Sequence, residues 1–125
     1  MLDTTVEPEV LPAWLTQDDL DYVIGEFSRT GFRGGLNWYR AIRPSAELLA
    51  AWRGCPVRQP SLFIGGTRDD VLRFPGMQQR VAALAQVLPG LRGVHLLEGA
   101  GHWVQRERAQ EVNALLLSFL AGLDG

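Results

Sequence analysis

The second half of the chain alternates two short apolar runs with two stretches of helical spacing. The runs are PSLFIGG (60–66) and GVHLLEG (93–99), and both are typical of buried strands and end in glycine. The stretches that follow them, 74–90 and 106–122, place apolar residues three and four apart, which predicts helices. A strand–helix–strand–helix order predicts parallel strands joined by a right-handed crossover. This half of the chain is therefore predicted to be α/β.

Two parallel strands do not make a complete sheet. Parallel sheets are normally covered on both faces and contain several strands, so two strands leave open edges and uncovered helix faces. Residues 1–59 contain no convincing further strand. We therefore interpret the chain as the end of a larger α/β sheet that is preceded by a helical segment.

The first half of the chain is predicted to be helical. Thr16 suits an N-cap and Gly31 a C-terminal cap, which places a helix between them. A second helical segment follows, and Pro44 is expected to interrupt it by opening a fresh turn. The linker-like composition of RGCPVRQP (53–60) suggests a boundary between residues 1–53 and 54–125.

Composition excludes several classes of protein. The chain has 125 residues, of which 46% are hydrophobic, and a net charge of −2, so we expect one soluble cytoplasmic protein that does not bind nucleic acid. It has no membrane-length apolar run and no signal-peptide pattern, and we expect no membrane partner. Its one cysteine, Cys55, rules out an internal disulfide and a cysteine-cluster zinc site. No cofactor and no metal are expected.

The candidate catalytic residues follow the two predicted strands. Asp69 and Asp70 come after the first strand, and His102 comes after the second. Because the carboxyl ends of adjacent parallel strands meet at one edge of a sheet, either aspartate is placed to hydrogen-bond the imidazole of His102. Such a contact fixes the tautomer of the ring and makes the histidine a general base.

No nucleophile accompanies this predicted pair. A nucleophile elbow brackets its reactive residue with small residues between a strand and a helix, and no serine of the chain has that setting. Cys55 precedes a proline in the linker, and no upstream aspartate follows a plausible strand. The group that His102 would serve is therefore expected to lie outside this sequence.

Specific motifs add a resemblance to this pattern. They are GFRGGLNWYR (31–40), GTRDDVLRFPGM (66–77) and GAGHWVQRERAQEVN (99–113). Together they resemble the C-terminal part of the soluble epoxide hydrolases of the α/β-hydrolase superfamily. The resemblance implies that residues 1–53 are the second half of a helical cap and residues 54–125 the C-terminal part of the hydrolase core.

The resemblance implies hydrolysis of an epoxide to a vicinal diol. In such enzymes an aspartate attacks an epoxide carbon to form a hydroxyalkyl-enzyme ester, and two cap tyrosines help to protonate the opening ring. An Asp–His pair then activates the water that hydrolyses the ester. The resemblance places one cap tyrosine at Tyr39, the relay acid at Asp69 in preference to Asp70, and the base at His102. Without the nucleophile, the isolated chain is predicted to be an inactive C-terminal fragment.

The resemblance also implies a substrate site and partners. The residues expected to line the site are Trp38, Leu72, Phe74 and Trp103. The expected partners are a small-molecule epoxide, water, and either the missing N-terminal half or a second copy of the chain. Two alternatives stay open: a dehalogenase-type relative, against which Tyr39 argues, and a non-catalytic truncated chain that self-associates through its open sheet edges.

Overall fold

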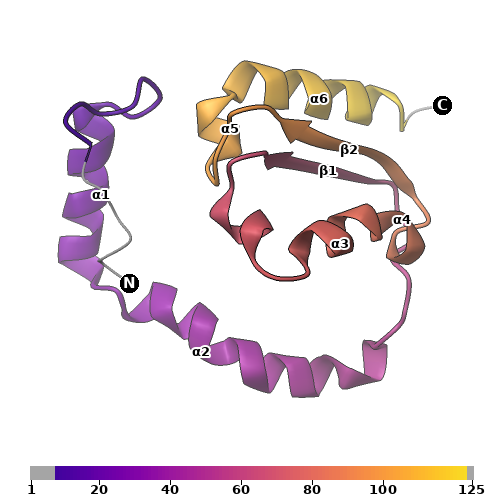
Figure 1. Ribbon diagram of the computed structural model, residues 1–125. Helices are drawn as coiled ribbons and strands as arrows, with labels where there is room; N and C mark the ends of the chain where they lie inside the picture. The colour runs from indigo at the N-terminus through magenta and orange to yellow at the C-terminus, as the bar shows by residue number, and fades with distance from the viewer. Residues whose placement is uncertain (1–7, 124–125) are drawn as a thin grey trace. The chain divides into compact units, whose positions relative to one another are not determined.

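The computed structural model describes residues 8–123 of the chain. The chain divides into two compact units, Met1–Arg53 and Gly54–Gly125. The first unit is helical, and the second contains both strands and helices (Figure 1). No helix within residues 8–123 has the length and apolar character that crossing a membrane requires.

The first helix of the structure, α1 (Gln17–Thr30), has the caps that the sequence predicts. The hydroxyl of Thr16 accepts the backbone N–H of Asp19, and the carboxylate of Asp19 accepts the N–H of Thr16, which completes a capping box. Gly31 ends the helix with φ 67°, a left-handed value that glycine adopts without steric cost. Phe32 stacks on Phe27 at 4.6 Å between ring centroids.

The second helix, α2 (Arg33–Leu48), runs without a break through Pro44 and is followed by the 3₁₀ helix η2 (Leu49–Trp52). The prediction that Pro44 interrupts this segment is therefore wrong. A proline removes one N–H donor and crowds the preceding turn, but it leaves the hydrogen bonds of the other turns available. These are sufficient to continue the helix here.

The second unit is built on a two-stranded parallel sheet. Strands β1 (Ser61–Gly66) and β2 (Leu91–Leu97) pair along their length, with one register irregularity between Ser61 and Leu62. The predicted parallel pair of strands is confirmed. Among the residues that the structure describes, no third strand adds to either edge of this sheet.

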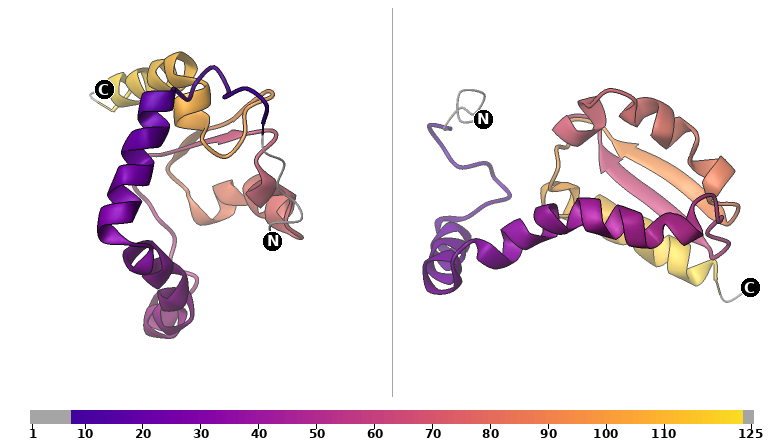
Figure 2. Two further views of the ribbon diagram at one scale, coloured as in Figure 1. Left: turned by 90° about the vertical axis from the view of Figure 1, so that its left-hand side faces the viewer. Right: turned by 90° about the horizontal axis from the view of Figure 1, so that it is seen from below.

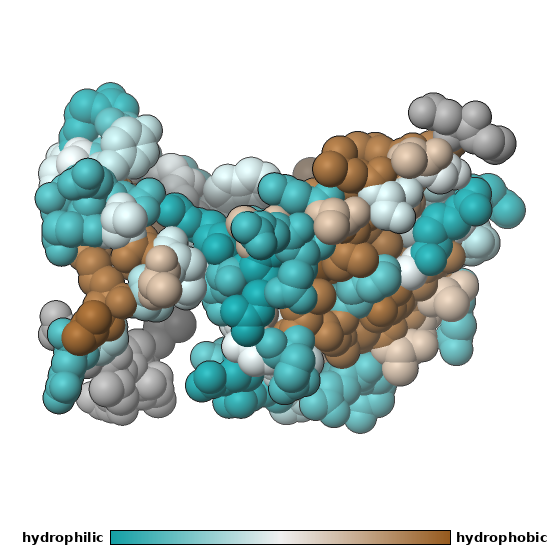
Figure 3. Space-filling view, turned by 90° about the horizontal axis from the view of Figure 1, so that it is seen from above, coloured by the Kyte–Doolittle hydropathy of each residue, from teal (hydrophilic) through white to brown (hydrophobic). Residues whose placement is uncertain are grey.

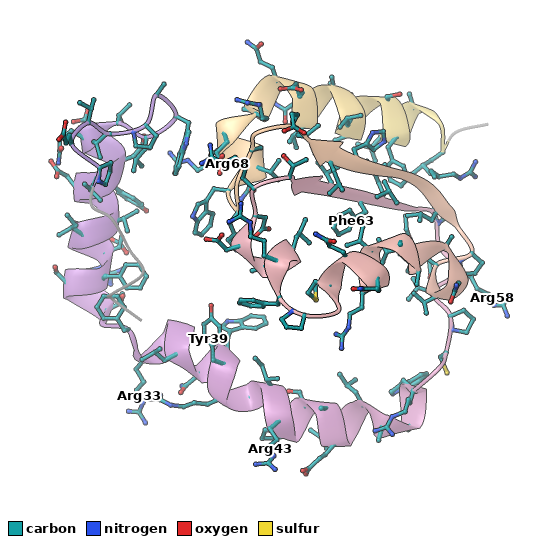
Figure 4. The ribbon with its side chains drawn as sticks, viewed as in Figure 1. Arg33, Tyr39, Arg43, Arg58, Phe63 and Arg68 are labelled. Carbon is teal, nitrogen blue, oxygen red and sulfur yellow. The ribbon has the colours of Figure 1, made fainter. Side chains whose placement is uncertain are left out.

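Helices lie on both faces of the sheet (Figure 2). The crossover from β1 to β2 carries η3 (Asp70–Arg73), α3 (Met77–Ala82) and α4 (Leu84–Val87). The sheet lies between α3 on one side and α6 (Ala109–Ala121) on the other. Phe63 projects from β1 toward α3 (Figure 4).

Two predicted helices are each divided in the structure. The crossover helix breaks at Ala83, whose φ and ψ of −92° and 3° lie outside the helical range. The last helix breaks at Arg108, with φ −134° and ψ 46°, into α5 (Val104–Glu107) and α6. The second break separates the short turn beside His102 from the long C-terminal helix.

Little of the described chain is buried. Among its hydrophobic side chains only Ala100 and Val112 are buried, at 0% and 6% exposure. Apolar residues of α6 remain exposed, and Figure 3, which looks onto this helix, shows apolar surface there. Large exposed apolar patches mark sites of interaction with protein, membrane or ligand, or surfaces prone to aggregation.

Candidate active site

Two loops carry the candidate site, and both begin at the same edge of the sheet. Gly65 pairs with Leu96 and Gly66 with Leu97, so β1 and β2 end side by side. Because the strands are parallel, the loop that begins at Thr67 and the loop that begins at Glu98 leave the sheet at its carboxyl edge. This is the edge at which active sites of α/β sheets form.

Three hydrogen bonds tie the two loops together. The backbone N–H of Thr67 donates to the carbonyl of Leu97 at 3.1 Å, and the N–H of Arg68 donates to the carbonyl of Ala100 at 2.8 Å. In return, the hydroxyl oxygen of Thr67 accepts the N–H of Gly99 at 2.9 Å. These hydrogen bonds do not involve Asp69 or His102. They therefore fix the relative position of the two loops independently of the contact between those side chains.

Gly66 permits this close approach. A Cβ atom at Gly66 would lie 2.2 Å from the carbonyl oxygen of Ala100 and 2.4 Å from that of Gly101. Both obstacles are backbone atoms, which cannot rotate away as a side chain can. Only a glycine at the end of β1 therefore leaves room for the loop that bears His102.

The structure brings Asp69 and His102 together. Both carboxylate oxygens of Asp69 lie 3.1 Å from Nδ1 of His102. One of these oxygens also accepts the backbone N–H of Val71 at 2.8 Å, so Asp69 is the N-cap of η3. Its side chain is 14% exposed and that of His102 is 58% exposed. The acid is thus held within the fold and the imidazole faces outward.

Asp70 does not take part in this contact. Its side chain is 88% exposed and lies 3.5 Å from the guanidinium of Arg73 on the same turn. Sequence alone left both aspartates open, and the N-cap geometry of Asp69 explains why it is the one directed inward.

The contact with Asp69 determines which nitrogen of His102 is basic. An ionised carboxylate only accepts hydrogen bonds, so the neutral ring makes this contact with its proton on Nδ1. The lone pair is then on Nε2, for which the described residues supply no hydrogen-bonding partner. A histidine in this state can take a proton from a water molecule at Nε2, while the carboxylate stabilises the resulting imidazolium.

Glu107 is a further residue beside the site; it belongs to the GAGHWVQRERAQEVN motif, but sequence analysis assigned it no role. Its carboxylate accepts the backbone N–H of Gly101 at 2.7 Å and that of Trp103 at 3.1 Å. These are the amides on either side of His102. The available signal was an acid one turn after the N-cap of a helix, a position that favours hydrogen bonds to free amides.

The expected substrate-lining residues of the second unit lie in different settings. Leu72 lines an apolar hollow of about 630 Å³ between α3 and β2, together with Val81 and Leu96. Phe74 is exposed after η3. Trp103 is also exposed, and its ring meets that of His102 edge-on at 5.5 Å between centroids.

Trp38 and Tyr39 belong to the first unit, where both project from α2. They are 81% and 75% exposed, and both line an open apolar hollow with Gly35 and Ile42. The hydroxyl of Tyr39 has no hydrogen-bonding partner among the described residues (Figure 4). A phenol on an exposed helix face is available to a ligand, but no hydrogen bond within residues 8–53 orients this one.

Metal ligation has no support in the described part of the chain. Residues 8–123 contain no group of three or more histidine, cysteine, aspartate or glutamate side chains placed to hold a metal ion. The ionisable side chains that the structure brings into contact at this edge of the sheet are Asp69 and His102.

Several epoxide hydrolases are similar to the chain in sequence, while no family model matches it. The chain is 50% identical to epoxide hydrolase A of Mycobacterium tuberculosis over 123 residues, which are 98% of this chain and 37% of that protein. It is 42% identical to epoxide hydrolase 1 of Siraitia grosvenorii over 115 residues, or 90% of this chain and 37% of that one. The chain thus spans little more than a third of the length of these relatives.

Solved structures of epoxide hydrolases also match the chain. Epoxide hydrolase A of Mycobacterium thermoresistibile superposes with a TM-score of 0.84 and 50% identity, over 94% of this chain and 35% of that one. Epoxide hydrolase I of potato superposes with a TM-score of 0.84 and 37% identity, over 88% of this chain and 35% of that one. The chain is therefore a homologue of the α/β-hydrolase epoxide hydrolases and corresponds to their C-terminal third.

Proposed function

We propose that this chain supplies the water-activating part of an epoxide hydrolase. The observation that carries the proposal is the contact of both Asp69 carboxylate oxygens with Nδ1 of His102 at 3.1 Å, which leaves Nε2 as the basic nitrogen. The relatives are named epoxide hydrolases, which favours this chemistry over that of a dehalogenase. Residues 1–53 would then be the second half of a cap and residues 54–125 the end of the hydrolase core.

The first step of the proposed reaction needs a carboxylate that residues 8–123 do not provide. That carboxylate attacks one carbon of the epoxide, the C–O bond of the ring opens, and a hydroxyalkyl ester forms on the enzyme. Tyr39 donates its phenolic proton to the oxygen of the opening ring, since a phenol is neutral near pH 7 and can act as an acid. Trp38 lies beside it on α2 and contributes apolar surface for the substrate.

The second step is the part that this chain performs. Nε2 of His102 takes a proton from a water molecule, whose oxygen attacks the carbonyl carbon of the ester. The ester C–O bond breaks, the leaving alkoxide takes the hydroxyl proton of the new carboxylic acid, and the diol leaves with the carboxylate regenerated. The proton on His102 returns to the Tyr39 phenolate through solvent, which restores both side chains. Asp69 stabilises the imidazolium during this step and holds the ring in the productive tautomer. Trp103 and Leu72 are proposed to shape the apolar wall around the substrate.

A chimera tests the proposal directly. The N-terminal part of Mycobacterium tuberculosis epoxide hydrolase A would be joined to this chain, in place of the C-terminal segment that the chain matches. We expect the chimera to convert an epoxide such as styrene oxide to its diol, while the isolated chain does not. In the chimera, His102→Ala should form the alkyl ester on the nucleophile, detectable by mass spectrometry, but should not turn over.

Asp70→Asn is the matched control, because it removes an aspartate beside Asp69 that does not contact the ring. The chimera with this change should keep nearly full activity. Undiminished turnover by the His102→Ala chimera would overturn the proposal. A folded chimera that does not form the ester would also contradict it.

One observation favours a second candidate, a non-catalytic chain that self-associates. The sheet has two edges without a partner strand in residues 8–123, and the apolar residues of α6 are exposed. Two copies could pair these edges and cover these faces. Sedimentation of the isolated chain across a range of concentrations distinguishes the candidates, because a discrete dimer supports self-association and a monomer excludes it.

A further inference from the structure

The carboxylate of Glu107 holds the backbone on both sides of His102. One oxygen accepts the N–H of Gly101 at 2.7 Å, and the other accepts the N–H of Trp103 at 3.1 Å. The side chain is half-buried, and its bond to Gly101 is partly shielded from water. Hydrogen bonds to an ionised acceptor are stronger than neutral ones, and partial burial strengthens them further.

The orientation of the His102 ring depends on this backbone. The His102 side chain is 58% exposed, and within residues 8–123 its ring meets the side chains of Asp69 and Trp103. The direction of its Cα–Cβ bond is set by the surrounding backbone, in which Glu107 binds the N–H of the residue before His102 and that of the residue after it.

The local sequence is adapted to this contact. A Cβ atom at Gly101 would lie 3.0 Å from one carboxylate oxygen of Glu107, closer than such atoms normally approach. Glycine at this position therefore lets the carboxylate reach the amide. The next residue, Arg108, secures the other end of the loop by donating from its guanidinium to the carbonyl of Glu98 at 3.3 Å.

We propose that Glu107 is a positioning residue for His102, which keeps Nδ1 of the ring directed at the Asp69 carboxylate. Without Glu107 the two flanking amides lose their acceptor, the loop gains conformations, and the ring leaves Asp69 in part of the molecules. The effect on hydrolysis rests on the proposed function. The orientation of the ring does not, and it can be measured on the full chain without any substrate.

Nuclear magnetic resonance of the imidazole nitrogens provides the test. The full chain, labelled with ¹⁵N, is studied at alkaline pH, where a histidine ring is neutral and its two tautomers differ in nitrogen shifts. We expect the proton of His102 to be on Nδ1 in most molecules of the unaltered chain. Asp69→Asn removes the acceptor and should shift the population toward the Nε2–H tautomer. Glu107→Ala should produce a shift in the same direction.

Glu111→Ala is the matched control. It removes the same kind of charge four residues further along, from the exposed side chain that pairs with Arg108 at 3.4 Å. The nitrogen shifts of His102 should stay unchanged in this variant. A role of Glu107 in stability alone would change the folded fraction but not the tautomer of the molecules that remain folded.

Glu107→Gln covers the case in which Glu107→Ala does not fold. Glutamine has nearly the same shape, but its amide keeps one acceptor oxygen and places a donor where the second amide needs an acceptor. An intermediate tautomer shift is expected. Folded Glu107→Gln or Glu107→Ala with the nitrogen shifts of the unaltered chain would overturn the proposal. Failure of the chimera to hydrolyse epoxides would count against the proposed function and leave this result standing.

Discussion

The two units of the chain position their candidate functional groups by different means. In Gly54–Gly125, Asp69 and His102 meet across 33 residues of sequence, and their loops are joined by backbone hydrogen bonds. In Met1–Arg53, Tyr39 lies on an exposed helix and its hydroxyl has no partner among the described residues. The second unit contains a preformed candidate acid–base pair, and the first contains a candidate proton donor whose hydroxyl no described residue holds in place.

This difference shows which geometry a part of a candidate active site can keep without the rest of the site. A proton-transfer pair needs two side chains at a fixed distance, and a parallel strand pair is sufficient to fix it. A proton donor to a substrate must be placed relative to that substrate, so its geometry depends on the remaining protein. Substitutions in the second unit should therefore change both the reaction rate and the stability. Substitutions in the first unit should change one of these without the other.

The largest effect is expected at the acid–base pair. In the chimera, Asp69→Asn should lower the rate of ester hydrolysis by about 10²–10⁴-fold, because the amide no longer stabilises the imidazolium and favours the wrong tautomer. Single-turnover kinetics would show fast ester formation and slow ester breakdown. Asp70→Asn, an equally conservative change one residue away, should leave both rates nearly unchanged. Equal losses in the two variants would contradict the distinction drawn between these aspartates.

A second prediction concerns the close approach of the two loops. Gly66→Ala should lower the free energy of unfolding by about 2–3 kcal/mol, because the new methyl group meets two backbone carbonyls. The control is Gly25→Ala in α1, where a Cβ has nothing within 4 Å and alanine should be neutral or stabilising by up to about 1 kcal/mol. Urea titrations followed through resonances of each unit measure both. Unchanged stability of Gly66→Ala would show that the loops can separate freely.

Tyr39→Phe provides a sharper test of the first unit. In the chimera it should lower the rate of ester formation about tenfold or more, because a hydrogen bond to a developing charge contributes roughly 1.5–3 kcal/mol. The stability of the isolated chain should not change, because the hydroxyl has no partner in the described structure. The matched variant is Tyr22→Phe, since Tyr22 is the other tyrosine of the chain and is exposed on α1. It should leave the rate unaltered.

The smallest effect is expected at the start of α1. Thr16→Ala removes one side of the capping box and should destabilise this helix by about 1 kcal/mol, seen as faster amide exchange in its first turn. Ser28→Ala, a hydroxyl loss in the last turn of the same helix, should not speed exchange in the first turn. In neither variant should the nitrogen shifts of His102 move. A change at His102 would show that the two units are coupled in the isolated chain.

Sequence patterns predicted those features that depend on local chemistry or on strand order. Thr16 and Gly31 bound α1 because capping is a local interaction, and the parallel strands follow from their alternation with helices. The same order placed Asp69 and His102 at one edge of the sheet. Their catalytic roles, like those of Tyr39 and the residues expected to line the substrate site, stay predictions.

Other features depend on tertiary geometry that a linear pattern does not contain. No glycine or proline marks the break at Ala83, and the break at Arg108 accompanies a contact with Glu98, ten residues away. Helix α2 continues through Pro44 although proline is a usual stop signal. The sequence did not indicate a role for Glu107, because its partners are backbone amides, which almost every residue possesses.

The parallel pairing of β1 and β2 has a consequence for how the chain folds. Parallel strands cannot form as a local hairpin, so the ladder closes only after the whole crossover has become ordered, at a cost in loop entropy. The hydrogen bond from His102 to Asp69 is formed beyond the end of that ladder. Formation of this hydrogen bond during refolding should therefore report that the non-local pairing of the two strands is complete.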